Sequence, residues 1–136
     1  IRDGRAVVWS YMKKYGSFRY AVRRWMGSSI MASLMIRSIA EERRCRIRYE
    51  DLVSEPEETL RAITGFLGLE FEQSMLSMDK TAHIGIGGNR MRFAGDSRIM
   101  PDNSWRAAMR NQHKLMFALV GGWLNYCHGY RGKTYV

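Results

Sequence analysis

Long hydrophobic runs and cysteines are scarce in this sequence. The longest apolar run covers residues 115–124 and is interrupted by Gly121 and Gly122, whereas a helix needs about 20 consecutive apolar residues to cross a bilayer. The two cysteines, Cys45 and Cys127, have neither C-x-x-C spacing nor histidines at metal-ligand spacing. These absences argue against a membrane-spanning segment, a disulfide scaffold and a metal site, and they predict two buried thiols.

The sequence also lacks an initiator methionine, a charged-then-apolar leader, internal repeats and low-complexity tracts. Because it starts at Ile1, we expect that a preceding part of the protein lies outside this chain. The 136 residues, 46% hydrophobic and 26% charged, suit one domain with a packed core. Negative charge is sparse, since 22 Lys and Arg against 13 Asp and Glu give a net charge of +9, which predicts a polyanionic partner.

Two segments are predicted to be β-strands. One ends at Arg2 and turns directly into a helix, and the other covers residues 44–49, where Cys45, Ile47 and Tyr49 share one face. Two strands among several helices indicate an α/β fold, in which a parallel sheet is flanked by helices and this chain is rich in helix. The carboxyl ends of both strands are expected at the same edge of the sheet.

Helices are predicted over most of the remaining chain. The first ends near Gly16, and the second covers residues 18–42, either as one helix or as two that join at residues 27–29. A short helix is expected over residues 73–78. The segment 79–103 is rich in glycine and has little periodicity, and long loops of this kind are often functional.

Two further helices are predicted from their capping residues. Ser54 is the expected N-cap of a helix that Pro56 begins and Gly68 ends, and Ser104 is the expected cap of the last helix. Each helix has an apolar stripe that we expect to be buried. The stripes are Leu60, Ile63, Phe66 and Leu67 in the first of these helices, and Trp105, Met109, Leu115, Met116, Leu119, Val120, Trp123 and Leu124 in the last.

Arg2 and Ser10 stand on either side of the first strand-to-helix turn. Such corners bind anions because a strand end, helix amides and basic side chains converge there. Arginines and helical serines are also common on surfaces that bind nothing, so this spacing alone leaves both interpretations open.

Three ordered motifs resemble those of the sulfotransferases that use 3′-phosphoadenosine 5′-phosphosulfate (PAPS). R-D-x-R-A-V-x-x-S covers residues 2–10, R-Y-E-D-L with a proline-started helix and F-L-G-L covers residues 48–69, and G-N-x-M-R-F covers residues 88–93. The resemblance extends over essentially the whole chain and corresponds to the C-terminal half of the family's domain. It is closest to the bacterial, carbohydrate-type and tyrosylprotein-type branches.

This resemblance implies that residues 1–136 are the C-terminal portion of a single sulfotransferase domain with a P-loop-like fold. It implies that Arg2 and Ser10 bind the 3′-phosphate of PAPS and that Tyr49 lies beside the adenine. The residues of the late loop expected to contact the nucleotide are Asn89, Arg90 and Arg92. No metal is implied, and a small-molecule or carbohydrate acceptor is expected.

The sequence identifies no catalytic residue. Glu50 and Asp51 stand at a strand-to-helix junction, where an acid more often caps amides or pairs with arginine. The histidines, His83, His113 and His128, have no Ser or Cys partner in a triad context. Under the resemblance, the 5′-phosphosulfate loop and the usual catalytic base lie upstream of this chain, so we expect the chain alone to be inactive.

The predicted function is transfer of a sulfuryl group from PAPS to a hydroxyl or amine acceptor. The alternative is a basic nucleic-acid-binding module that uses Arg43, Arg44, Arg46 and Arg48. Such a module would bind DNA or RNA with steep salt dependence, whereas the enzyme would bind adenosine 3′,5′-bisphosphate saturably. An exposed sheet edge predicts self-association, and few cysteines with no N-x-S/T sequon favour a bacterial cytoplasm.

Overall fold

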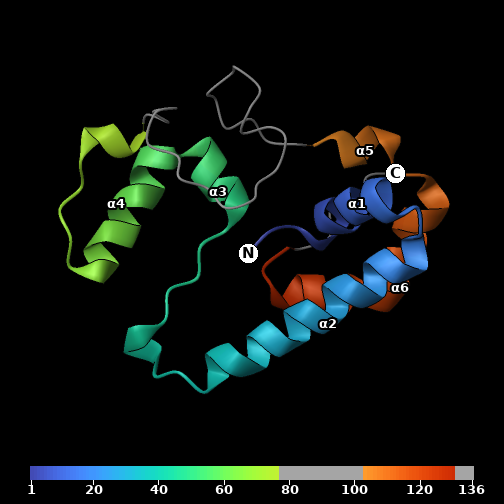
Figure 1. Cartoon of the computed structure of the whole chain (residues 1–136), viewed down its shortest axis with the longest axis horizontal. Coiled ribbons are helices and arrows are strands. Elements are labelled where there is room, and N and C mark those ends of the chain that lie inside the picture. Colours follow the sequence, from blue (N-terminus) through green and yellow to red (C-terminus); the bar gives the residue numbers. More distant parts are fainter. Residues whose placement is uncertain (77–102, 131–136) are drawn as a thin grey trace. The chain divides into compact units, whose positions relative to one another are not determined.

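The computed structural model describes residues 1–76 and 103–130, and every regular element within these ranges is helical. In chain order the elements are α1 (Gly4–Tyr15), α2 (Phe18–Arg37), η1 (Glu41–Arg43), α3 (Tyr49–Ser54), α4 (Pro56–Leu67), η2 (Gln73–Leu76), α5 (Ser104–Ala108) and α6 (Asn111–Cys127), where η marks a 3₁₀-helix (Figure 1). They belong to two compact units, one of residues 1–48 and 102–136 and the other of residues 49–101. The single domain expected over residues 1–136 stays a prediction.

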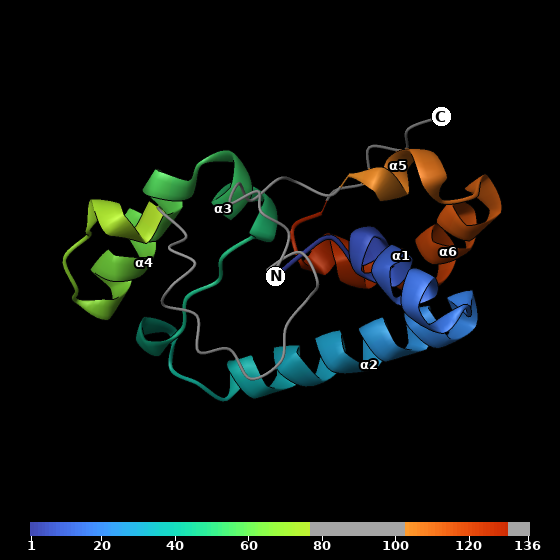
Figure 2. The same ribbon diagram turned by 45° about the horizontal axis from the view of Figure 1, so that its top comes forward.

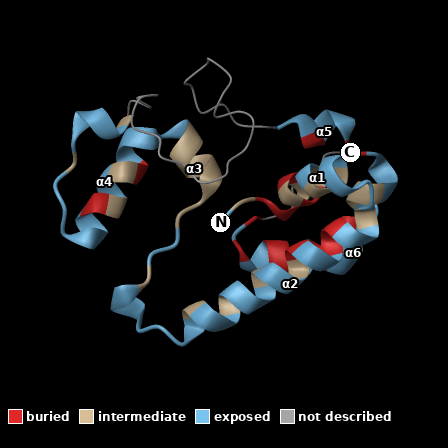
Figure 3. Ribbon diagram, in the orientation of Figure 1, coloured by how far each residue is buried: buried red, intermediate tan, exposed pale blue. Residues whose placement is uncertain are grey.

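The core of the first unit lies between α1, the first half of α2 and α6. The Trp25 side chain of α2 is 3% exposed, and its ring meets the Phe117 ring of α6 at a centroid distance of 5.0 Å. Figure 2 shows α1, α2 and α6 packed together, and Figure 3 shows that the buried residues of α2 are confined to its first half. Burying apolar side chains of this size contributes about 1.5–3 kcal/mol each. The buried cluster comprises Val8, Ala21, Val22, Trp25, Met109, Phe117 and Leu124.

The two helices predicted within the first 37 residues are confirmed. Asp3 caps α1, and Gly16 ends it in the left-handed conformation with φ 71°, which glycine adopts without strain. α2 is one continuous helix through residues 27–29, and the Ser28 hydroxyl donates within it to the Arg24 carbonyl. It ends at Arg37 rather than near residue 42, and η1 follows.

Neither predicted β-strand is found among the described residues, so the α/β expectation is not met there. Arg44 has extended dihedral angles, yet residues 44–48 form no strand and Tyr49 begins α3 instead of ending a strand. One hydrogen bond, from the amine of Ile1 to the carbonyl of Ile47 (2.5 Å), joins the two segments predicted to be strands. A ladder requires repeated bonds and further strands, because an isolated pair is marginal in water.

The boundaries of α4, in the second unit, differ from the prediction at one end. The N-cap of α4 is Glu55 rather than Ser54, because Ser54 is the last residue of α3. Gly68 ends α4 as predicted, with φ 68°. The prediction of a buried apolar stripe is wrong, because Leu60 and Ile63 are only half-buried and Phe66 and Leu67 are 42% and 58% exposed. The buried residues of α4 are Thr59 and Thr64.

The predicted last helix is divided in two at Met109, which is extended and 1% exposed. The predicted stripe is also wrong for α6, because most of its members lie on the exposed side. The exposed members are Leu115, Met116, Leu119, Val120 and Trp123, whereas the buried residues of α6 are Phe117, Gly121, Leu124 and Asn125. Apolar residues of α6 lie on all sides of the helix. The periodicity of the sequence therefore does not identify the face that packs against α1 and α2.

Both cysteine thiols are free and exposed, so the prediction of burial is wrong. Cys45 lies in the extended segment after η1, and Cys127 is the last residue of α6, where neither packs into the core. Within residues 1–76 and 103–130, no group of three or more His, Cys, Asp or Glu side chains could hold a metal ion. In the same ranges no helix has the length and apolar character needed to cross a membrane.

Two adjacent glycines of α6 provide a test of this packing. A Cβ at Gly121 would stand 2.8 Å from Cζ3 of Trp25, whereas the closest neighbour of a Cβ at Gly122 is 3.9 Å away. Gly121→Ala should lower the free energy of unfolding by about 1–3 kcal/mol through overpacking. Gly122→Ala should raise it by up to about 1 kcal/mol through helix propensity. Urea denaturation measures both, and equal effects would contradict the close approach of α6 to Trp25.

Candidate functional site

The segment that enters α1 is held by a buried carboxylate. Asp3 is 7% exposed. Its Oδ1 accepts from the main-chain nitrogen of Arg5 at 2.9 Å and from Arg5 Nε at 3.0 Å, and its Oδ2 accepts from Arg5 Nη2 at 2.7 Å. Asp3 therefore caps α1 and fixes the Arg5 guanidinium, which also lies 4.6 Å from the ring centroid of Trp105. Arg5 has a structural role here.

Asn125 of α6 completes this corner from the other end of the chain. Its Oδ1 accepts from the main-chain nitrogen of Gly4 at 2.8 Å, and its Nδ2 donates to Asp3 Oδ1 at 3.3 Å. Asn125 is 3% exposed, so both bonds are shielded from water. Sequence reasoning missed this residue, because an asparagine among apolar residues near a helix end gives no sign of a partner more than a hundred positions away.

A second contact from the end of the described chain supports the same segment. Tyr130 is 6% exposed, and its hydroxyl donates to the carbonyl of Ile1 at 3.4 Å. The guanidinium carbon of Arg48 lies 4.7 Å from the centroid of the Tyr130 ring. The residues on either side of Arg2 are thus fixed by side chains from α6 and the turn after it.

Arg2 is half-buried between these fixed residues, and Ser10 is exposed on α1. The main-chain nitrogens of Gly4 and Arg5 are already bonded to Asn125 and Asp3. These two amides are therefore occupied, and an anion at this corner would have to be bound by other groups, such as side chains. The convergence of Arg2 and Ser10 on one phosphate stays a prediction.

The placement of the other predicted binding residues relative to this corner stays a prediction. Tyr49 is half-buried and begins α3 in the second unit. Glu50 and Asp51 follow it in the first turn of α3, where a carboxylate is favoured by the helix dipole. Asn89, Arg90 and Arg92 lie outside the described residues, as does His83.

The two described histidines are packed against protein groups. The His113 ring stacks on Phe18 with a centroid distance of 4.5 Å and an angle of 9°. His128 is 8% exposed, and its Nε2 lies 3.3 Å from the Ser33 hydroxyl. Burial of the ring lowers the pKa of His128 below its ordinary value of 6.5, and the charges of Arg46 and of the terminal amine act in the same direction.

The fold is similar to that of a solved sulfotransferase domain, the one in the olefin synthase of Synechococcus PCC 7002. The match has a TM-score of 0.67 and covers 97% of this chain and 48% of that chain, at 22% sequence identity. Over the described residues, this likeness concerns the arrangement of helices, because the sheet is not seen there.

The sequence comparisons show the family. The model of the sulfotransferase family matches residues 1–73, which is more than half of the chain. This chain therefore belongs to the sulfotransferase family, as the three motifs indicated.

Two tyrosylprotein enzymes are among its relatives. The chain is 26% identical over 111 residues to protein-tyrosine sulfotransferase A of Caenorhabditis elegans and 26% identical over 113 residues to the protein-tyrosine sulfotransferase of Drosophila melanogaster. The matches cover 76% of this chain in both cases, but only 29% and 23% of the relatives. The chain thus spans less than a third of their length. None of these comparisons supports the nucleic-acid-binding alternative.

Replacement of Asn125 should destabilise the corner. Asn125→Ala leaves the buried N–H of Gly4 without its acceptor, which should lower the free energy of unfolding by about 1–3 kcal/mol. Asn111→Ala, the same substitution at an exposed position of α6, is the matched control and should change it by less than about 0.5 kcal/mol. Urea denaturation followed by circular dichroism measures both, and similar losses would show that Asn125 does not hold the corner.

Proposed function

We propose that this chain supplies the 3′-phosphate and adenine side of the donor site of a PAPS-dependent sulfotransferase. The enzyme transfers the sulfuryl group of PAPS to a hydroxyl or amine acceptor. A small molecule or carbohydrate is one acceptor class, and the names of the two relatives suggest the tyrosine hydroxyl of a protein as another. The family assignment supports sulfuryl transfer in general.

The observation that carries the proposal is the rigid corner that precedes α1. Asp3 and Asn125 hold its backbone through buried hydrogen bonds. A corner fixed in this way presents Arg2 and Ser10 with little loss of conformational entropy on binding. The planar guanidinium of Arg2 is suited to two oxygens of a phosphate, and the Ser10 hydroxyl to a third.

The remaining residues of the donor site are proposed on the family motifs. Tyr49 offers its ring face or hydroxyl to the adenine, and Asn89, Arg90 and Arg92 close over the nucleotide. In-line transfer depends mainly on positioning and on charge stabilisation. A phosphate end held firmly by Arg2 and Ser10 therefore fixes the position of the reacting end.

We also propose that residues 1–3 and 44–48 are neighbouring strands of a parallel sheet in the complete protein. The hydrogen bond from Ile1 to Ile47 supports this pairing. In a parallel sheet, ligands bind beyond the carboxyl ends of the strands. Arg2 lies near the end of the first segment and Tyr49 directly follows the second, so the pairing would bring both residues to the donor.

The donor role of Arg2 is tested with two nucleotides that differ by one phosphate. Arg2→Ala in the complete protein should weaken binding of adenosine 3′,5′-bisphosphate by about 10- to 150-fold, because a charge-assisted hydrogen bond contributes about 1.5–3 kcal/mol. Binding of adenosine 5′-phosphate, which lacks the 3′-phosphate, should stay unchanged. Isothermal titration calorimetry measures both affinities.

Arg23→Ala removes an exposed arginine from α2 and is the matched control. It should leave both affinities unchanged. If Arg2→Ala weakens the two nucleotides equally, Arg2 does not contact the 3′-phosphate. Tight DNA or RNA binding with a steep salt slope would instead favour the basic nucleic-acid-binding module.

The isolated 136-residue chain should not transfer sulfuryl groups. The contacts proposed here bind the 3′-phosphate and the adenine. Each missing hydrogen-bond donor at the reacting group can lower the rate of transfer about a hundredfold or more. PAPS-dependent sulfation by this chain and by the complete protein should be measured side by side, with self-association of the chain followed by light scattering. Comparable turnover would place the catalytic residues within these 136 residues.

A further inference from the structure

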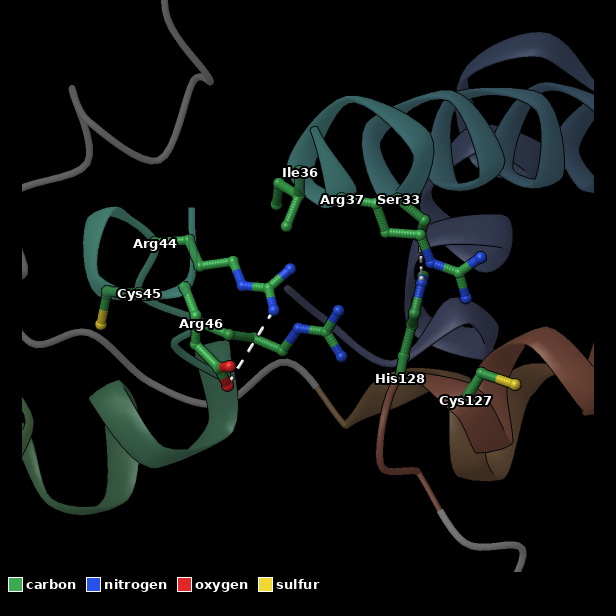
Figure 4. Close-up of a pocket in the computed structure, with 9 residues that line it drawn as sticks. Ser33, Ile36, Arg37, Arg44, Cys45, Arg46, Cys127 and His128 are labelled. Atoms are coloured by element: carbon green, nitrogen blue, oxygen red, sulfur yellow. Dashed lines mark hydrogen bonds and ion pairs between the residues drawn. The ribbon is translucent and has the colours of Figure 1, made fainter. Parts of the chain in front are cut away.

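A second basic site in the first unit is lined by other residues than those of the corner before α1. A cavity of about 370 Å³ opens between the end of α2, the segment that contains η1, and the end of α6 (Figure 4). Its size is that of a small-molecule pocket. The polar and charged residues that line it include Ser33, Arg37, Glu41, Arg44, Arg46 and His128.

Positive charge dominates the lining of this cavity. Three arginines face one glutamate, and the pair formed by Arg44 Nη2 and Glu41 Oε1 is long, at 3.9 Å. The Glu41 side chain is 86% exposed, so this pair is largely solvated and weak. Within the part of the chain that the structure describes, no carboxylate pairs with Arg37 or Arg46.

The guanidinium groups of Arg44 and Arg46 point in the same direction, into the space that His128 bounds on the other side (Figure 4). They come from alternate positions of an extended segment, which places both side chains on one face. Two guanidinium groups converging in this way can offer several N–H donors to one ligand. Ile36 lies at the border of the same space and adds an apolar surface.

The orientation of His128 follows from its neighbour. The Ser33 hydroxyl donates to the carbonyl of Ser29 at 2.8 Å, so its oxygen accepts the Nε2–H of His128 at 3.3 Å. The opposite ring nitrogen, Nδ1, carries a proton only when the ring is charged. Because its pKa is lowered, the ring is neutral at pH 7, and the positive field in the cavity comes from the arginines.

We propose that this cavity binds a tetrahedral oxyanion, either inorganic sulfate or phosphate or the same group carried as a monoester, between Arg44, Arg46 and His128. Arginine forks match the oxygen spacing of such a group and bind it through charge-assisted hydrogen bonds. In a monoester, the organic part contacts Ile36. The site shares no residue with the proposed donor corner and does not depend on the donor role of Arg2.

A bound oxyanion changes the titration of His128. Its negative charge opposes the effect of Arg46 and favours the imidazolium, so binding is coupled to proton uptake and strengthens as the pH falls. The other titratable or charged groups that line the cavity are Arg37, Glu41, Arg44, Cys45 and Cys127.

The test uses the complete protein and two probes, inorganic sulfate for the free ion and 4-nitrophenyl sulfate for the monoester. The double variant Arg44→Gln/Arg46→Gln should lose at least about tenfold in affinity for both probes in calorimetry at constant ionic strength. Arg19→Gln/Arg23→Gln makes the same charge change at exposed positions of α2 and should retain wild-type affinity. Tighter binding of the ester than of the free ion would identify a monoester as the ligand.

A competition and a further variant assign the site. Sulfate binding should be retained when adenosine 3′,5′-bisphosphate is present at saturation, because the nucleotide occupies the proposed donor corner and Arg2 does not line the cavity. His128→Gln should abolish the gain in affinity between pH 7 and 5.5, and the single variant Arg46→Gln provides a second measure if His128→Gln unfolds. Absence of sulfate binding, equal losses in the two double variants, or loss of sulfate binding when the nucleotide is present would overturn the proposal.

Discussion

The hydrogen bonds of the Asn125 side chain are the constraint on which the first unit depends. They connect α6 to the main chain at Gly4 and to the carboxylate of Asp3, and all of these groups are buried. A buried polar group without a partner is costly, so the three residues are stable only together. The corner before α1 consequently exists only when α6 is in place, although more than a hundred residues separate them in the chain.

The packing around Trp25 makes this arrangement possible. Its indole occupies space that side chains at Gly4 and Gly121 would fill, so α1 and α6 can both approach α2 closely. Phe117 lies against the same ring. Apolar contact thus sets the distance between the helices, and the hydrogen bonds of Asn125 then fix their register. The proposed role of this corner rests on Arg2, which begins the first of the three motifs.

The two basic regions of the first unit differ in how they are built. At the corner, Asp3 neutralises Arg5 and buried bonds fix the backbone. In the cavity, Arg44 and Arg46 lie on an extended segment with a weakly paired Glu41. Part of the net charge of +9 therefore lies in two sites of distinct character.

The sequence by itself determined the family, the course of α1 and α2 and the glycine that ends α4, because motifs, caps and left-handed glycines are local signals. Tertiary structure decided which face of α6 is buried, where the last helix breaks at Met109, and that both cysteines are exposed. Because α6 has apolar residues on several sides, its sequence is compatible with more than one buried face.

Residues 44–48 have the alternation of a strand, but a strand forms only where neighbouring strands complete its hydrogen bonds. Asn125 belongs to the same class, since its importance lies in a contact that no local pattern encodes.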